Sequence, residues 1–250
     1  MAQGIRLHTW GDFALFTRPE MKAERVSYDV ITPSAARGVL EAVYWKPQIR
    51  WVVTKIHVLK KPRFTNIRRN EVGSIAGKPS AAAMAGEAIA PIGLYVDEDR
   101  QQRASLILQD VAYVIEARFD ILDRRFERGG TEVSEHGAAG KHLAMFTRRA
   151  AAGQAFQQPY FGCREFPAHF ALLPHDAPLP ASELAGTGER DLGYMLHDIA
   201  FIQDKQGKIV EARNGDDNRP GNRVRAEPRF FRATMIDGMI DVPDFSKSLA

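Results

Sequence analysis

Hydrophobic and polar residues alternate along several segments of the chain and predict a protein of the α+β class. In residues 50–59, Val52 and Ile56 fall on one face of the extended chain, whereas Lys55 and His57 fall on the other. This alternation is typical of a strand that buries one face and exposes the other. The segments with strand patterns in the first two thirds of the chain are residues 5–16, 50–59, 67–72, 103–121 (with a kink expected at 109–110) and 166–173.

Two further segments have the sequence features of helices. Thr32 suits the N-cap, and Pro33 the first position, of a helix that ends before Pro47. A second helix is predicted over residues 142–149, after a mobile loop over residues 123–140. Apart from the short segment at residues 67–72, these elements follow the order strand, helix, strand, strand, helix, strand, which is the ferredoxin-like β-α-β-β-α-β arrangement.

The chain is expected to divide into two domains. Residues 1–173 form the ferredoxin-like domain, and residues 174–190, which are rich in proline, alanine and glycine, form a linker. Residues 191–250 are predicted to form a small antiparallel β domain. Its expected strands are residues 194–202, 208–213 and 229–242, with a turn at residues 204–207 between the first two.

The composition is that of an ordinary globular protein. The 250 residues are 44% hydrophobic and 26% charged, which is enough for a sizeable core. The single cysteine, Cys163, allows no intramolecular disulfide and favours a reducing compartment. No apolar run reaches the roughly eighteen residues of a membrane helix, and the first residues lack the pattern of a secretory signal. We therefore expect a soluble cytoplasmic protein.

The net charge is only +3, but the basic residues are clustered. The first cluster contains no acidic residue and consists of Lys46, Arg50, Lys55, Lys60, Lys61, Arg63, Arg68 and Arg69. A second arginine-rich stretch, residues 213–232, also contains acidic residues. A solvated basic surface would account for one such cluster, whereas two favour binding to a polyanion.

The segment over residues 141–170 combines basic, imidazole and aromatic side chains. Lys141 and His142 are adjacent at the expected junction between the loop and the second helix. Packing alone rarely requires such a pair, whereas an anionic ligand that carries bases would use it, and RNA is the most plausible ligand. Tyr160 and Phe161 are suited to stack on bases, and equally suited to fill the seam between helix and strand.

Arg148 and Arg149 follow in the second helix. Adjacent residues point to different faces of a helix. One arginine is therefore expected to bind phosphate, and the other to pack or to pair with Glu165.

Two long segments carry a resemblance to a known family. They are GDFALFTRPEMKAERVSYDVITPSAARGVLEAVYWKP (11–47) and KHLAMFTRRAAAGQAFQQPYFGCREFPA (141–168). Both closely resemble the subtype-d branch of the Cas-five family, the repeat-associated subunits of type I-C CRISPR systems, and the likeness extends to the C-terminal strands. The resemblance implies a ferredoxin-like, RNA-recognition-type fold of the RAMP superfamily with a C-terminal β extension. It also implies metal-independent cleavage of CRISPR repeat RNA, after which the protein stays bound to the 5′ handle of the guide RNA.

The resemblance carries over a catalytic set of a tyrosine, a lysine and a histidine, at Tyr44, Lys141 and His142. RNA can be cut without metal because its own 2′-OH attacks the adjacent phosphate, leaving a 2′,3′-cyclic phosphate and a 5′-OH. Lys141 would stabilise charge on the phosphate, while Tyr44 and His142 would transfer protons in an order that the sequence leaves open. No cofactor or metal is expected, since no cluster of metal ligands stands out. The residues expected to bind RNA are Lys46, Arg50, Lys55, Arg68, Arg69, Arg148, Arg149, Tyr160 and Phe161.

Other interpretations remain open. If the three residues have a purely structural role, Tyr44 caps the core with its hydroxyl in contact with water, and Lys141 and His142 are ordinary surface residues. A second functional hypothesis is a non-catalytic scaffold subunit that binds the 5′ handle while another protein cuts. A third is duplex-DNA binding by the basic surface, which would be steeply salt-dependent. The expected protein partners, the backbone and large subunits of the type I-C interference complex, follow from the resemblance alone.

Overall fold

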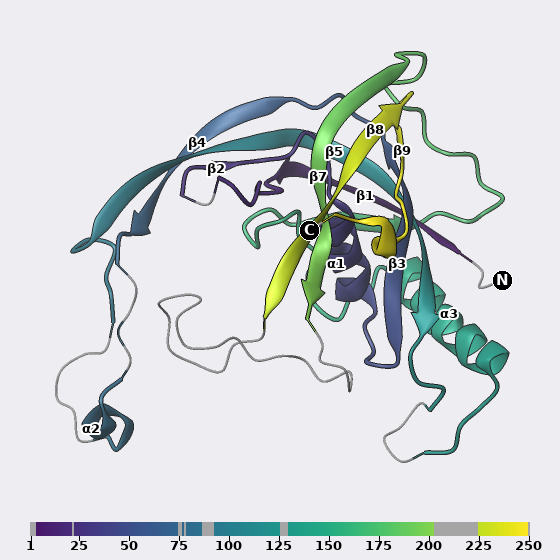
Figure 1. Ribbon diagram of the computed structural model, residues 1–250, viewed down its shortest axis with the longest axis horizontal. Helices are drawn as coiled ribbons and strands as arrows, with labels where there is room; N and C mark the ends of the chain where they lie inside the picture. The colour runs from purple at the N-terminus through teal and green to yellow at the C-terminus, as the bar shows by residue number, and fades with distance from the viewer. Residues whose placement is uncertain are drawn as a thin grey trace.

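The computed structural model describes residues 4–21, 23–74, 77, 79–86, 93–125, 130–202 and 225–249 of the chain. Within this part, nine strands form one large sheet and three α-helices accompany it (Figure 1). The protein is therefore mostly β, with few helices. No helix in these ranges is both long and apolar enough to cross a membrane.

The sheet is antiparallel except at one short strand. Its strands run in the order β6 (His169–Leu172), β1 (Ile5–Ala14), β5 (Arg100–Ile121), β3 (Ile49–Val58), β9 (Met239–Asp241), β8 (Ala226–Ile236) and β7 (Glu189–Phe201). Two others pair with β5, namely β2 (Arg25–Val26, in parallel) and β4 (Phe64–Val72). The helices are α1 (Pro33–Val43), α2 (Ala81–Met84) and α3 (Glu135–Ala151), with a final 3-10 turn, η1 (Phe245–Lys247).

Strand β5 is long enough to pair with different strands along its two halves, and so it connects two regions of the sheet. Its first half pairs with β4 in a hairpin that extends away from α1 and α3, and its second half pairs with β1 and β3 (Figure 1). Between the halves, Asp110 adopts a positive φ of 51°, which is unusual for a residue other than glycine. This agrees with the kink predicted at residues 109–110.

Helix α1 forms as the sequence predicted. The Thr32 side chain accepts a hydrogen bond from the Ala35 N–H at 3.2 Å, and Pro33 occupies the first turn. The helix ends at Val43, and Tyr44 is its extended C-cap residue. The predicted N-terminus is confirmed, and the end lies close to the position predicted.

Helix α3 begins earlier than predicted. Ser134 caps it by accepting from the Gly137 N–H at 3.1 Å, so residues 135–140 are helical and not part of a mobile loop. The glycines in this stretch disfavour a helix, but Ala138 is fully buried and its packing offsets that cost. As a consequence Lys141 lies in the middle of the helix, and the predicted loop–helix junction at this residue is wrong.

The C-terminal strands continue the sheet. Strand β9 pairs with β3, and β8 links β9 to β7. The single strand predicted over residues 229–242 is wrong, because Asp237 and Gly238, at φ values of 49° and 84°, form a turn between β8 and β9. The strand and turn predicted at 208–213 and 204–207 lie outside the described residues. The division into two domains stays a prediction.

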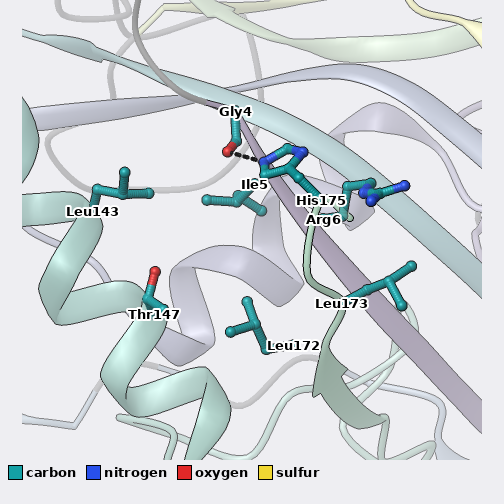
Figure 2. Close-up of a pocket in the computed structure, with 8 residues that line it drawn as sticks. All are labelled: Gly4, Ile5, Arg6, Leu143, Thr147, Leu172, Leu173 and His175. Carbon is teal, nitrogen blue, oxygen red and sulfur yellow. Dashed lines mark hydrogen bonds between the residues drawn. The ribbon is translucent and has the colours of Figure 1, made fainter. Parts of the chain in front are cut away.

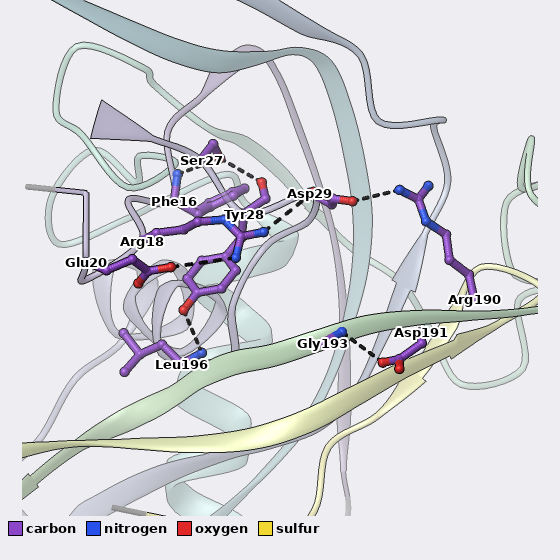
Figure 3. Close-up of polar contacts among 10 residues, drawn as sticks. All are labelled: Phe16, Arg18, Glu20, Ser27, Tyr28, Asp29, Arg190, Asp191, Gly193 and Leu196. Atoms are coloured by element: carbon purple, nitrogen blue, oxygen red, sulfur yellow. Dashed lines mark hydrogen bonds and ion pairs between the residues drawn. The ribbon is translucent and has the colours of Figure 1, made fainter. Parts of the chain in front are cut away.

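Side-chain contacts fix β7 to the first part of the chain. The Tyr28 hydroxyl accepts from the Leu196 N–H at 3.2 Å, and Arg190 pairs with Asp29 at 2.7 Å (Figure 3). The guanidinium of Arg18 lies 4.5 Å from the centre of the Tyr28 ring. These contacts, between segments far apart in sequence, hold β7 near α1.

Candidate active site

Tyr44 is held at the end of α1 by contacts to its backbone and to its ring. Its N–H donates to the Leu40 carbonyl at 2.9 Å, and its own carbonyl accepts from Trp51 Nε1 at 2.9 Å. The guanidinium of Arg149 lies 5.4 Å from the centre of its ring and donates to the Val43 carbonyl at 3.2 Å. The position of this tyrosine is therefore set by β3 and α3 as well as by α1.

The structure brings Tyr44 and His142 together. The Tyr44 hydroxyl and His142 Nδ1 are 2.8 Å apart, although the two residues are 98 positions apart in the chain. The same hydroxyl also donates to Met145 Sδ at 3.5 Å. The residues are only 1% and 2% exposed, so in this state the hydrogen bond is covered.

Aromatic residues surround the pair on the side of the sheet. The ring of Phe119 on β5 meets the His142 ring edge-on at 6.2 Å. Trp51 packs on Phe146 at 4.9 Å between centroids, and so joins β3 to α3. The sequence analysis did not identify Trp51, because strict alternation places it on the polar face with Lys55 and His57. An irregularity between Val53 and Lys55 shifts the register of β3, so that Trp51 and Ile56 are both buried. Phe146 follows His142 by one helical turn, and this spacing was the signal that could have placed both on one face of α3.

Burial and charge determine the protonation of the pair. Burial lowers the pKa of His142 below 6.5, and the positive charges of Lys141 and Lys46 lower it further. Burial raises the pKa of Tyr44 above 10, while Arg149 acts in the opposite direction. At neutral pH His142 is therefore uncharged and Tyr44 keeps its proton.

The two adjacent arginines of α3 have different surroundings, as predicted from their spacing. Arg148 is exposed, whereas Arg149 is partly buried against Tyr44. Of the two alternatives predicted for the second arginine, packing describes Arg149, while Glu165 accepts from Arg69 at 2.7 Å. The charge that acts on the Tyr44 phenol is that of Arg149.

The remaining predicted RNA-binding cations fall into two groups. Arg50, Lys55 and Arg69 each lie within 4 Å of a carboxylate, on Asp120, Asp241 and Glu165 respectively. In contrast, no described carboxylate forms an ion pair with the exposed Lys46 or Arg68.

The cations also differ in their place on the sheet. Arg69 lies opposite Arg103 at the start of β5, whereas Trp51, which holds Tyr44, lies opposite Phe119 near its end. Arg68 and Arg69 are therefore not brought together with Tyr44.

The aromatic turn after α3 is mainly a packing element. Phe161 is fully buried, and its ring meets those of Phe16 and Tyr113 edge-on at 5.9 and 5.8 Å. It is therefore not available to stack on a base in this state, and its ring packs against residues of the sheet and of the segment after β1. Tyr160 is half-buried, and its backbone forms an isolated bridge with Pro167.

A separate cavity of about 440 Å³ lies between α3 and the ends of β1 and β6 (Figure 2). Leu143 and Thr147 line it from α3, with the start of β1 and the end of β6 opposite. Two of its polar side chains already bond to the backbone, since His175 donates to the Gly4 carbonyl at 2.6 Å and Arg6 donates to two carbonyls after β6. These hydrogen bonds therefore fix the chain after β6, and the cavity is not part of the site at Tyr44.

Part of the second basic stretch, residues 213–224, lies outside the described residues. Of the rest, Arg225 and Arg229 pair with Glu227, and Arg232 pairs with Asp191 at 2.6 Å. Within the described ranges, no group of three or more histidine, cysteine, aspartate or glutamate side chains has the arrangement of a metal site. The chemistry that these residues can support is thus proton transfer at the Tyr44–His142 pair, next to the lysines Lys46 and Lys141.

Comparison with known proteins gives a consistent result. Residues 4–243 match the Cas5d model of the CRISPR-associated Cas5 proteins. A CRISPR pre-crRNA endoribonuclease Cas5d from Mannheimia succiniciproducens is 50% identical over 98% of this chain and 97% of its own length. A protein of the same description from Thermus thermophilus is 40% identical over 96% of this chain and 91% of its own. A solved structure of a CRISPR-associated protein, 19% identical, has the same fold with a TM-score of 0.63 and covers 100% of this chain and 96% of that one.

Proposed function

Because the chain belongs to the Cas5d family of CRISPR-associated proteins, we propose that it is an endoribonuclease that cleaves CRISPR precursor RNA. The observation that carries the proposal for this chain is the 2.8 Å contact between Tyr44 and His142, where burial, together with the charges of Lys141 and Lys46, keeps His142 neutral. A neutral imidazole next to a protonated phenol is suited to take one proton and return another.

The architecture supports an RNA-recognition-type assignment. We assign the ferredoxin-like fold to β1, α1, β3, β5, α3 and β6, with β7, β8 and β9 as its C-terminal extension. The strand order β6-β1-β5-β3, with one helix after β1 and another after β5, is the order of that fold. We keep the predicted domain boundaries, with the extension joined to the first domain through β9 and β3.

In the proposed mechanism the 2′-oxygen bonds to phosphorus while the bond from phosphorus to the 5′-oxygen breaks. With its proton on Nδ1, His142 donates to the Tyr44 oxygen, which leaves the Tyr44 proton directed at Met145 in the resting state. His142 Nε2 then accepts the 2′-OH proton, the Nδ1 proton passes to Tyr44, and Tyr44 gives its own proton to the 5′-oxygen. The protons balance, and the products are a 2′,3′-cyclic phosphate and a 5′-OH. No metal takes part in these steps.

Cationic side chains complete the proposed site. Lys141 is exposed on α3 next to His142 and stabilises charge on the phosphorane. Arg149 supports the phenol as it loses and regains a proton. Because Tyr44 and His142 are covered in the unbound protein, productive binding of RNA has to expose them.

We further propose that the protein keeps the 5′ handle of the guide RNA within the type I-C interference complex, together with its backbone and large subunits. Lys46, Arg68 and Arg148 are the strongest candidates for contacts to phosphate, since none is paired with a described carboxylate. Arg50, Lys55 and Arg69 would have to exchange a carboxylate for phosphate, and we therefore expect them to contribute less to phosphate binding.

The test is cleavage of the cognate repeat RNA in EDTA. Wild type is compared with Tyr44→Phe, Lys141→Ala and His142→Ala, and with the control Lys247→Ala, which removes an exposed lysine from η1. The three site variants are expected to bind RNA and to lose cleavage by about 10²-fold or more, whereas the control cleaves normally. Cleavage only after addition of Mg²⁺ would contradict the mechanism.

A second candidate function is handle binding without cleavage. The observation that favours it is the burial of Tyr44 and His142, because a buried tyrosine–histidine hydrogen bond is also a common structural element. Tight binding of the repeat by the wild type with no cleavage under any condition would support this alternative.

A further inference from the structure

We infer that Trp45 and Phe156 form a stacking subsite for unpaired nucleobases at the C-terminal end of α1, next to Tyr44. The inference rests on the proposed function in so far as it takes RNA as the substrate. It adds two residues from separate parts of the chain that the sequence analysis did not select.

Both aromatic side chains are exposed at the same helix end. Trp45 directly follows Tyr44 and is 54% exposed, and Phe156 is 77% exposed. The Phe156 N–H donates to the Ala42 carbonyl at 2.8 Å, which anchors its backbone to the last turn of α1. Large aromatic side chains that are this exposed and this close to a candidate site favour a ligand with flat apolar faces.

Hydrogen-bond donors make the C-terminal end of α1 compatible with an anionic ligand. The C-terminus of a helix carries partial negative charge on its unpaired carbonyl groups, which would repel phosphate. Here donors from three other segments cap the last carbonyls. Phe156 and Gln157 donate to Ala42, Arg149 donates to Val43, and Trp51 donates to Tyr44.

A positive charge lies next to Trp45 in the chain. Lys46 directly follows Trp45 and is exposed. No described carboxylate forms an ion pair with it. An exposed aromatic ring beside an unpaired cation suits a nucleotide better than an apolar protein surface, because the ring takes the base and the cation takes the phosphate.

The experiment measures binding rather than cleavage, so that its outcome is separate from that of the nuclease proposal. Fluorescence anisotropy in EDTA gives the Kd for repeat RNA whose unpaired nucleotides carry 2′-deoxyribose, which prevents attack by a 2′-OH. Each aromatic residue is changed to Ala, Leu and Tyr, for example Trp45→Ala, Trp45→Leu and Trp45→Tyr. The control is Tyr194→Ala, which removes a 59% exposed aromatic ring from β7.

Stacking predicts a specific order among these variants. The Ala and Leu variants are expected to bind about fivefold to 150-fold more weakly, and the Tyr variants within about twofold of wild type. Tyr194→Ala is expected to bind as wild type does. An abasic nucleotide is then placed in turn at each unpaired position of the RNA. At one position it should abolish the difference in Kd between wild type and Trp45→Ala. At one position it should likewise abolish the difference in Kd between wild type and Phe156→Ala.

Three results would overturn the inference. Leu variants that bind as well as Tyr variants would show an apolar contact without stacking. A difference that persists at every abasic position would show that the contact is not to a base. Variants that bind RNA normally but no longer assemble with other complex subunits would show that the two rings contact protein. If the stacking pattern holds while wild type does not cut natural repeat RNA, the nuclease proposal fails and the inference stands.

Discussion

Removing the Tyr44 hydroxyl tests whether its contact with His142 is catalytic or only structural. Tyr44→Phe keeps the ring beneath Arg149 and deletes one buried hydrogen bond of 2.8 Å. Such a bond contributes about 1 kcal/mol net, and an imidazole nitrogen left buried without it costs about 1–3 kcal/mol. We therefore expect the free energy of unfolding, measured in urea, to fall by about 1–3 kcal/mol.

That loss of stability cannot by itself explain a large loss of activity. A domain of ordinary stability unfolds at about 5–15 kcal/mol, so at least about 2 kcal/mol remains and about 97% of the molecules stay folded. Loss of a proton-transfer group lowers the rate by about 10²- to 10⁴-fold. Cleavage per folded molecule should therefore fall far more than the folded fraction does.

Tyr28→Phe is the matched control. Tyr28 is 2% exposed, an arginine lies over its ring, and its hydroxyl makes a hydrogen bond, here to the Leu196 N–H (Figure 3). This variant should lose similar stability and keep its cleavage rate. If Tyr44→Phe instead cleaves within about threefold of wild type, the Tyr44–His142 contact is structural and the proposed mechanism is wrong.

Three further predictions concern packing, pH and salt. Gly162→Ala should lower the free energy of unfolding by about 3–5 kcal/mol, because at φ +82° its Cβ would lie 2.0 Å from the Leu15 carbonyl oxygen. Gly153→Ala, at φ +64° with no atom near its Cβ, should cost only about 1–2 kcal/mol, and equal losses would contradict this difference. Lys46→Gln removes a charge that lowers the pKa of His142, so that pKa should rise. Because His142 accepts a proton only when neutral, the acidic limb of the kcat/KM profile should move to higher pH, while Lys247→Gln leaves it in place. A limb that stays or moves down after Lys46→Gln would be evidence against His142 as the base. Arg68→Ala should reduce the salt dependence of RNA binding by about 0.7 in the slope of log K against log salt, and Lys55→Ala by less, because Lys55 already pairs with Asp241 at 3.4 Å. Equal slopes for the two variants would contradict this ranking of the cations.

The sequence predicted helix α1 because its signals are local. Thr32 and Pro33 define the start through the N–H groups of the first turn, and Pro47 limits the end. The same kind of signal was present at Ser134, which caps α3. It was overlooked because glycine and alanine follow it, and only the burial of Ala138 against other elements makes that stretch helical.

The site itself depends on contacts between distant segments, which local patterns do not contain. The pairing of Tyr44 with His142 was expected from resemblance to a family and not from spacing. The position of Arg149 over Tyr44 was not expected at all, although it lies seven residues after His142 and so on the same face of α3. A search for residues two turns from His142 would have found it.

The ion pairs of the basic cluster likewise depend on contacts between distant segments. The sequence analysis did not distinguish the paired from the unpaired cations among those it selected, because the carboxylate partners are supplied by segments much later in the chain. Asp120 on β5 and Asp241 on β9 are brought to Arg50 and Lys55 only by the pairing of those strands with β3. An exposed ion pair contributes about 0–1 kcal/mol, so phosphate can displace such a carboxylate, but the exchange gains less than binding to an unpaired cation. In the proposed RNA complex we therefore expect affinity to depend less on the number of cations on the surface than on which of them lack a carboxylate partner.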